Sequence, residues 1–374
     1  MPLAAGSAPP PQLDGVVAAQ SSICLLSPED NRLAYRGYDV VELAERGSFE
    51  ETAFLLLAGR LPRRDELGGF VASLRGRRKL PRSVLRLVRD APAGAEPMAL
   101  LRTAVSALGL EPTGPDDVPG IPPAALDLVA QMPTVVAVIY RTWRGEKPIT
   151  PRRGLGTAAN FLYMLRGEEP DKALARAFEV ALSLRAENEL NPSTFAARVA
   201  AATQADVHGC ITAALAALAG PLHGGHALAV YRLLQEIGTA DRLGLMVDAR
   251  VAAGKAFPGF GHPVYRGEDP RTAAMRRAAE AAAAASPEWL DLARAAEARA
   301  RTATGQFANV DFYLAPLYHA AGIPPEFFTP VFAVGRIPGW LAHVLEQRAQ
   351  EGLIRPRAAY VGPTRQEYVS LRRR

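Results

Sequence analysis

Three of the six histidines lie in glycine-rich segments, where a side chain can meet a ligand closely. His223 and His226 belong to GPLHGGH at 220–226, and His262 belongs to FPGFGHP at 257–263. Glycine has no side chain, so backbone and substrate can approach each other there. A histidine in such a loop can donate a hydrogen bond to an oxygen on which negative charge develops. The remaining histidines lie in helical patterns that favour a packing or surface role: His208, His319 and His343.

Asp311 is the carboxylate that stands out as a base. It lies in NVDFY at 309–313, and its apolar and aromatic neighbours are expected to desolvate it and strengthen it as a base. Taken alone, an Asp in this segment could instead cap a helix. The segment by itself leaves both roles open.

The HxxH spacing of His223 and His226 also allows a metal site. No Glu lies between them, and no Cys or acidic residue lies nearby in the sequence, so support for zinc is weak. Gly259 and Gly261 lack the third glycine and the preceding strand of a dinucleotide-binding motif. We therefore expect no bound metal and no cofactor.

Composition indicates a soluble globular protein. Of the 374 residues, 49% are apolar and 22% are charged, and the length favours about two domains. No apolar run approaches the roughly 18–20 residues of a membrane-spanning helix. Residues 1–11 have no cationic start and no long apolar stretch, so we expect no secretion signal. Cys24 and Cys210 are the only cysteines, which fits a reducing cytoplasm.

The net charge of +5 favours anionic ligands over nucleic acid. Basic clusters occur at 75–82 and 372–374, but they are not interleaved with aromatic residues and no nucleic-acid-binding module is recognisable. A solvated surface is one explanation, and an excess of Arg also suits small polyanionic ligands. We expect no nucleic-acid partner and no membrane partner.

The elements that must position these residues are mostly helical. Ala, Leu, Arg and Glu fill most segments, and no long alternation of Val, Ile and Thr predicts a large sheet. A β-hairpin is expected with strands at 22–27 and 32–35. Ser48 can cap the N-terminus of a helix, Gly59 can end it, and Asn191 followed by proline can start another. Further helices are expected at 124–143, 157–165, 171–185, 207–219 and 340–350.

Three segments resemble, in the same order, the catalytic segments of citrate synthases. They are PLHGG at 221–225, GFGH at 259–262 with DPR at 269–271, and NVDFY at 309–313. Other similar segments are YRGYD at 35–39, NFLYML at 160–165, STFAARV at 193–199, GWLAH at 339–343 and IRPRA at 354–358. The resemblance covers nearly the whole chain, so the chain is identified as a member of this family.

The resemblance implies a mostly α, two-domain helical fold with a short N-terminal β-hairpin. The large domain would comprise residues 1–224 and 323–374. The small domain, residues 225–322, would close over the substrates. The protein partner would be a second copy of the chain, in a homodimer.

By the same resemblance, the chain would condense acetyl-CoA with oxaloacetate to give citrate and CoA. His223 would hydrogen-bond the thioester carbonyl while Asp311 removes a methyl proton, and His262 would polarise the keto carbonyl. A thioester methyl group is a very weak acid, so its proton is removed only if the charge that reaches the oxygen is stabilised. Hydrolysis of the citryl-CoA intermediate would drive the reaction forward.

Two substrate carboxylates need cations, and arginines occupy the family's positions for them. Arg271, Arg336 and the partner subunit's Arg355 would bind the 2-oxo acid, because planar guanidinium groups suit bidentate carboxylate binding. Coenzyme A would contact a separate set of residues: Arg266 through a phosphate, Gly259 and Gly261.

The chain departs from the family around the 2-oxo acid. Most members have HADHE where this chain has RAENE at 185–189, so Asn188 replaces a histidine that binds oxaloacetate. An amide can donate a hydrogen bond but carries no charge. His226 stands where Ala is frequent, Pro263 where Arg is frequent, and Thr304 where many relatives have a Lys that contacts CoA. The resemblance therefore implies a retained reaction and leaves the substrates open.

Three alternatives stay open. A 2-methylcitrate synthase, or a synthase for another 2-oxo acid or acyl-CoA, would use the same residues, and one extra methylene usually shifts selectivity by about 10–200-fold. A catalytically weak ligand-binding paralogue would keep the fold and the dimer, a hypothesis that rests on Asn188 and Thr304. A metal-dependent hydrolase using His223 and His226 would be sensitive to chelators.

Overall fold

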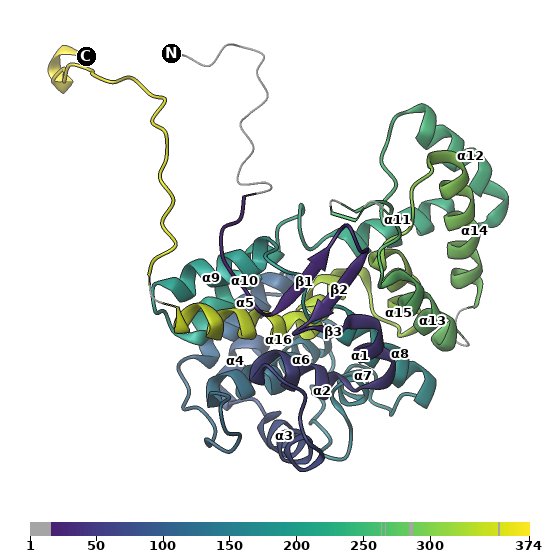
Figure 1. Ribbon diagram of the computed structural model, residues 1–374, viewed down its shortest axis with the longest axis horizontal. Coiled ribbons are helices and arrows are strands. Elements are labelled where there is room, and N and C mark those ends of the chain that lie inside the picture. Colours follow the sequence, from purple (N-terminus) through teal and green to yellow (C-terminus); the bar gives the residue numbers. More distant parts are fainter. Residues whose placement is uncertain (1–15, 263, 266, 284–286, 351) are drawn as a thin grey trace.

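The structure is a computed structural model that describes residues 16–262, 264–265, 267–283, 287–350 and 352–374. Within that part the chain forms sixteen α-helices and one small sheet (Figure 1). The prediction of a mostly α fold is confirmed.

The N-terminal sheet is antiparallel, in the order β1 (Cys24–Ser27), β2 (Arg32–Tyr35) and β3 (Tyr38–Asp39). The β1–β2 register places the turn at residues 28–31. The predicted hairpin is therefore confirmed, and β3 adds a short third strand.

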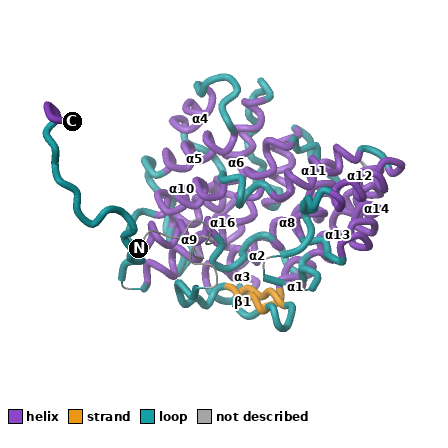
Figure 2. The backbone as a smooth tube through the Cα atoms, turned by 90° about the horizontal axis from the view of Figure 1, so that it is seen from above, coloured by secondary structure: helices purple, strands orange, loops and turns teal. Residues whose placement is uncertain are grey.

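The larger part of the molecule consists of α1 to α10 and α16 (Figure 1). Helix α16 packs against α2, α5, α6, α8, α9 and α10, so it lies at the centre of this part, as the tube in Figure 2 also shows. The helices and their bounds are α1 (Val40–Arg46), α2 (Phe49–Ala58), α3 (Arg64–Arg77), α4 (Arg82–Arg89), α5 (Pro97–Leu108), α6 (Pro123–Trp143), α7 (Thr157–Arg166), α8 (Lys172–Leu184), α9 (Pro192–Ala202), α10 (Val207–Leu218) and α16 (Phe328–Ala349).

Helix α6 passes the length and hydropathy test for a membrane-crossing helix, and it is the one helix of the described residues that does so. However, 83% of its most apolar 18-residue window is buried inside the protein. Its apolar side chains therefore contribute to the hydrophobic core, which is the ordinary role of such a helix in a folded domain.

The remaining helices gather on one side of the molecule (Figure 1). They pack on one another, and α13 also packs against α8 of the larger part. All of them fall within residues 225–322, the predicted small domain, although the division into two domains stays a prediction. Their bounds are α11 (His226–Ile237), α12 (Ala240–Ala252), α13 (Thr272–Ala282), α14 (Pro287–Thr304) and α15 (Val310–Ala320).

Helix termini follow the capping residues that the sequence offers. The Ser48 hydroxyl accepts a hydrogen bond from the Glu51 amide at 3.1 Å, and α2 ends at Gly59, whose φ of 78° suits glycine. Asn191 caps α9 through the Thr194 amide at 3.2 Å. These three predictions are confirmed.

The last long helix differs from its prediction. The sequence predicts a helix at 340–350, whereas α16 starts twelve residues earlier, at Phe328. Pro338 lies inside the helix, where burial of the surrounding apolar residues outweighs the lost backbone hydrogen bond. The added turns carry Phe332 and Arg336, which reach the candidate site.

Candidate active site

The structure brings Asp311, His223 and two unexpected residues to one place. Asp311 lies in the first turn of α15, just after the N-cap residue Asn309, and His223 lies in the turn that precedes α11. Arg185, directly after α8, and His226, at the start of α11, complete the group. These side chains line a cavity of only about 10 Å³, together with Gly224, Ala227, Leu314, Tyr318, Phe328 and Phe332.

His223 is held by Ser193 through its Nε2. Its Nε2 accepts a hydrogen bond from the Ser193 amide at 3.3 Å and lies 2.8 Å from the Ser193 hydroxyl oxygen. That oxygen also accepts a hydrogen bond from the Trp340 indole at 3.0 Å. Because Nε2 is an acceptor, neutral His223 carries its proton on Nδ1 and can donate it to a ligand.

Burial keeps His223 neutral. It lowers the pKa of this imidazole to about 4, and the positive charges of Arg336 and Arg185 act in the same direction. A neutral imidazole is a hydrogen-bond donor that does not give up a full proton at neutral pH. His223 is therefore suited to stabilise charge that develops on an oxygen.

His262 has the opposite tautomer. Its Nδ1 accepts hydrogen bonds from the amides of Val264 at 3.1 Å and Tyr265 at 3.2 Å, so the proton lies on Nε2. Burial lowers its pKa to about 4, with a further contribution from the charge of Arg271. The structure thus provides a second neutral donor.

The loop that carries His262 is fixed to the start of α15. Asn309 donates its amide N–H to the Gly259 carbonyl at 2.8 Å and its side-chain Nδ2 to the Gly261 carbonyl at 2.9 Å. Both glycines have positive φ, and a Cβ on Gly259 would lie 2.6 Å from Val230 and 3.0 Å from Phe312. The predicted role of Gly259 and Gly261 in CoA binding stays a prediction, while the close packing around Gly259 leaves no room for a side chain.

Asp311 is buried and doubly paired. One carboxylate oxygen accepts a hydrogen bond from Arg185 Nη1, and the other lies 3.7 Å from His226 Nδ1. Burial alone would raise the pKa of Asp311, but the charge of Arg185 and the contact with His226 outweigh it and hold this pKa below its usual range. The expectation of a base strengthened by desolvation is wrong for this state, because it did not include the two partners.

Arg271 is buried and engaged by Asp269. Its Nε and Nη2 donate to the two carboxylate oxygens at 2.9 and 2.8 Å, and the Val310 amide donates to the same carboxylate at 3.2 Å. This bidentate pair connects Arg271 to the first residue of α15. To bind Arg271, a substrate carboxylate would have to share its guanidinium group with Asp269 or displace Asp269 from it.

Arg336 is buried beside Arg185. Its Nε donates to the Arg185 carbonyl at 2.7 Å, and its guanidinium lies 4.7 Å from the centre of the Phe332 ring. Burial lowers the pKa of Arg336 to about 10; Glu187 opposes this shift and Arg185 adds to it. The group stays cationic at neutral pH and is the best candidate here for a carboxylate ligand.

The other predicted ligands are less well placed. Asn188 is half-buried, and in the described residues its Oδ1 is buried without a hydrogen-bond partner. Arg355 is exposed in the C-terminal segment that leaves the body of the chain (Figure 1), so one chain alone does not bring it to the site. Arg266 lies outside the described residues.

Sequence reasoning missed the roles of Arg185, Ser193 and His226. Arg185 was visible as a departure from the family's pattern, and Ser193 began one of the resembling segments. His226 was weighed as a metal ligand, whereas its nearest charged partner is Asp311. In the part of the chain that the structure describes, no three His, Cys, Asp or Glu side chains are grouped as metal ligands.

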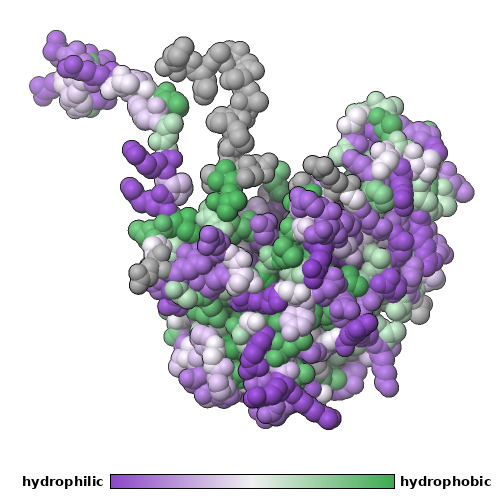
Figure 3. Space-filling model, in the orientation of Figure 1, coloured by the Kyte–Doolittle hydropathy of each residue, from purple (hydrophilic) through white to green (hydrophobic). Residues whose placement is uncertain are grey.

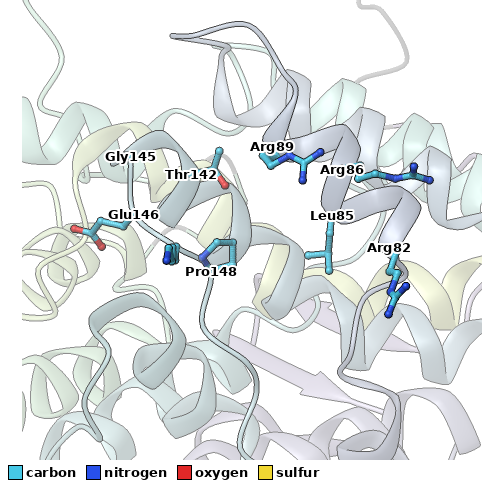
Figure 4. Close-up of a pocket in the computed structure, with 9 residues that line it drawn as sticks. Arg82, Leu85, Arg86, Arg89, Thr142, Gly145, Glu146 and Pro148 are labelled. Atoms are coloured by element: carbon cyan, nitrogen blue, oxygen red, sulfur yellow. The ribbon is translucent and has the colours of Figure 1, made fainter.

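A larger cavity, of about 930 Å³, lies elsewhere, between α4 and the loop after α6 (Figure 4). None of the predicted site residues lines it. Its walls are Arg82, Leu85, Arg86, Arg89, Thr142, Gly145, Glu146, Lys147 and Pro148.

A buried carboxylate, two neutral imidazole donors and buried guanidinium groups suit an enzyme that forms an enol and holds a carboxylate substrate. Residues 12–357 match the family model described as the C-terminal domain of citrate synthase. The chain belongs to the citrate synthase family, and it is an enzyme of the type that condenses an acyl-CoA with oxaloacetate.

Relatives extend over nearly the whole chain. A 2-methylcitrate synthase of Mycobacterium tuberculosis is 42% identical over 352 residues, covering 94% of this chain and 90% of that protein. Citrate synthase 2 of Bacillus subtilis is 40% identical over 369 residues, covering 97% and 98%. A solved ternary complex of citrate synthase from Thermoplasma acidophilum with carboxymethyl coenzyme A and oxaloacetate has a TM-score of 0.88 at 30% identity, covering 97% of this chain and 99% of that one.

Proposed function

We propose that this enzyme condenses acetyl-CoA with oxaloacetate and that Asp311, His223 and His262 carry the reaction. The observation that supports these roles is the hydrogen bond from a backbone amide to one ring nitrogen of each histidine. Each has one ring nitrogen occupied by a backbone amide, which leaves a donor on the other nitrogen. Two neutral donors near one buried carboxylate match a reaction that develops charge on two oxygens.

In the proposed mechanism, Asp311 takes a proton from the methyl group of the thioester. The Nδ1–H of His223 donates to the thioester oxygen as charge reaches it. The carbon of the resulting enol then bonds to the keto carbon of oxaloacetate, whose oxygen is polarised by the Nε2–H of His262 and gains a proton. Water finally cleaves the thioester and releases citrate and CoA.

The carboxylates of oxaloacetate would be bound by Arg336, Arg271 and the partner subunit's Arg355. Guanidinium groups suit this task because they bind carboxylates with two parallel hydrogen bonds. Asn188 would contribute an amide donor. CoA would contact Arg266, Gly259 and Gly261. Because protein side chains fill every role, the proposed reaction uses no cofactor.

We further propose a homodimer in a reducing cytoplasm. Residues 352–370 form an extended arm without helix or strand, which stands clear of the body in Figure 3. Three apolar side chains on or just beyond this arm are strongly exposed: Leu353 (65%), Val361 (75%) and Leu371 (81%). Such an arm would be covered by a second subunit, and it carries Arg355. Cys24 and Cys210 are both free thiols.

The choice of acyl-CoA is tested by comparing acetyl-CoA and propionyl-CoA. With oxaloacetate present, the thiol of released CoA is measured and kcat/KM is determined for each. We expect acetyl-CoA to be preferred by about tenfold or more, within the usual effect of one methylene. A preference for propionyl-CoA would identify a 2-methylcitrate synthase, the activity named for the relative in Mycobacterium tuberculosis.

One observation favours a second candidate, a catalytically weak ligand-binding paralogue. Arg185 occupies the Asp311 carboxylate, and the cavity between them and His223 is nearly filled. This candidate predicts thermal stabilisation by oxaloacetate without CoA release. Turnover at ordinary enzyme rates would exclude it.

A further inference from the structure

Arg185 is buried at the site and has no role in the proposed mechanism. It stands where the family's motif has its first histidine, and its side chain is buried, 8% exposed. Nη1 pairs with Asp311, while Nε is buried and has no hydrogen-bond partner among the described residues. A buried guanidinium with an unused donor leaves room for one more acceptor.

Arg185 also lies beside the predicted carboxylate ligand. The guanidinium groups of Arg185 and Arg336 lie 4.1 and 4.7 Å from the centre of the same Phe332 ring. Both cations are buried and repel each other, since the charge of Arg185 helps to lower the pKa of Arg336. A carboxylate that contacts both would relieve this repulsion and satisfy the free Nε.

The ion pair between Arg185 and Asp311 opposes the proposed chemistry. While Arg185 holds Asp311, one carboxylate oxygen is occupied by a cation and the carboxylate is a weak base. The cavity of about 10 Å³ is also close to the smallest space that holds one water molecule, so no acyl group fits there. Catalysis therefore requires Arg185 to leave Asp311.

We propose that Arg185 is a positioning residue that holds Asp311 in an ion pair until a carboxylate of the 2-oxo acid draws the guanidinium away to the side of Arg336. This inference rests on the proposed function. It makes binding of the 2-oxo acid the event that frees the base, since Asp311 loses its cation and stays buried. No bond is made or broken in this step, and Arg185 exchanges one carboxylate for another.

The test measures whether Asp311 and oxaloacetate compete for Arg185. Oxaloacetate is titrated by calorimetry into the wild type, Asp311→Asn, Arg185→Gln and the double variant. If the two carboxylates compete, Asp311→Asn binds oxaloacetate about tenfold more tightly than the wild type, a coupling of ordinary size. In the Arg185→Gln background, Asp311→Asn has no such effect.

Equal affinity of the wild type and Asp311→Asn would overturn the proposal and leave the proposed function standing. A wild type that binds no oxaloacetate and releases no CoA would overturn both. Thermal unfolding of each variant checks that it is folded, because an unpaired buried Arg185 destabilises the protein.

A second measurement does not need Asp311→Asn. Exchange of the acetyl-CoA methyl protons with D₂O is followed by NMR, with and without malate, which has both carboxylates of oxaloacetate but no keto carbon. Malate is expected to speed exchange by about tenfold in the wild type and hardly at all in Arg185→Gln, which exchanges without it. Equal stimulation in both proteins would contradict the proposal.

Discussion

At the scale of single residues, the site depends on groups whose charge is set by burial. Both histidines are neutral because an imidazolium would be poorly solvated there and would lie near arginines. Asp311 is ionised because Arg185 and His226 offset its burial. A proton acceptor and two uncharged donors therefore coexist at neutral pH.

This charge arrangement predicts an unusual pH profile. Protonation of either histidine would break the hydrogen bond that its acceptor nitrogen receives from a backbone amide and would replace a neutral donor by a cation. Both histidines have a pKa of about 4, below the ordinary value of about 6.5. The pKa of Asp311 lies below its usual range, so the two histidines control the acid limb. We therefore expect kcat/KM to fall near pH 4. The charged and titratable groups that act on these three are Arg185, His226, Asp269, Arg271 and Arg336.

The profile is measured from pH 3.5 to 8 with acetyl-CoA as the varied substrate and oxaloacetate saturating. An acid limb centred between pH 6 and 7 would mean that an ordinary imidazole controls the rate. The assignment of neutral, buried histidines would then be wrong.

At the scale of elements, Asn309 couples the start of α15 to the loop of His262. Its Oδ1 accepts from the Asp311 amide at 3.0 Å, while its Nδ2 and backbone N–H hold the carbonyls of Gly261 and Gly259. One residue thus positions the segment of the proposed base, Asp311, and the segment of one proposed donor, His262.

Replacing Asn309 by Ala should therefore cost more activity than stability. Loss of an N-cap costs about 1 kcal/mol of unfolding free energy. We expect kcat to fall by more than tenfold, since misplacement of a catalytic group by about 1 Å can cost about 100-fold. Ser48→Ala is the matched control, because Ser48 caps α2 away from the site. Equal kcat in the two variants would show that Asn309 only caps its helix.

Residues that are adjacent in sequence predicted several of the secondary-structure elements. The predictions failed where contacts between residues far apart in sequence stabilise the structure. The hairpin, the cap at Ser48 and the start of α9 follow from residues adjacent in sequence, so they could be predicted. The first half of α16 could not, because its stability comes from burial around Pro338. The pair between Arg185 and Asp311 joins residues 126 positions apart, and no local pattern indicates it.

At the scale of the whole molecule, the predicted site is incomplete in one chain. Arg355 lies on an exposed arm with exposed apolar residues, whereas Arg336 and Arg271 are buried at the site. If the arm reaches a second subunit, each active site takes one arginine from its neighbour.

Subunit mixing tests this arrangement. Arg355→Ala and Asp311→Asn are each expected to be nearly inactive as pure proteins. Refolded together in equal amounts, they should regain about a quarter of wild-type activity, because half of the dimers would be mixed and one of their two sites would be intact. No recovery in a mixture that forms mixed dimers would exclude an arginine shared between subunits.

The most direct test of the proposed reaction is CoA release from acetyl-CoA with and without oxaloacetate, for the wild type and Asp311→Asn. We predict release that depends on oxaloacetate in the wild type and falls at least about 100-fold in Asp311→Asn, the usual contribution of a general base. Unchanged release in Asp311→Asn would exclude Asp311 as the base, and release that does not depend on oxaloacetate would exclude the proposed condensation.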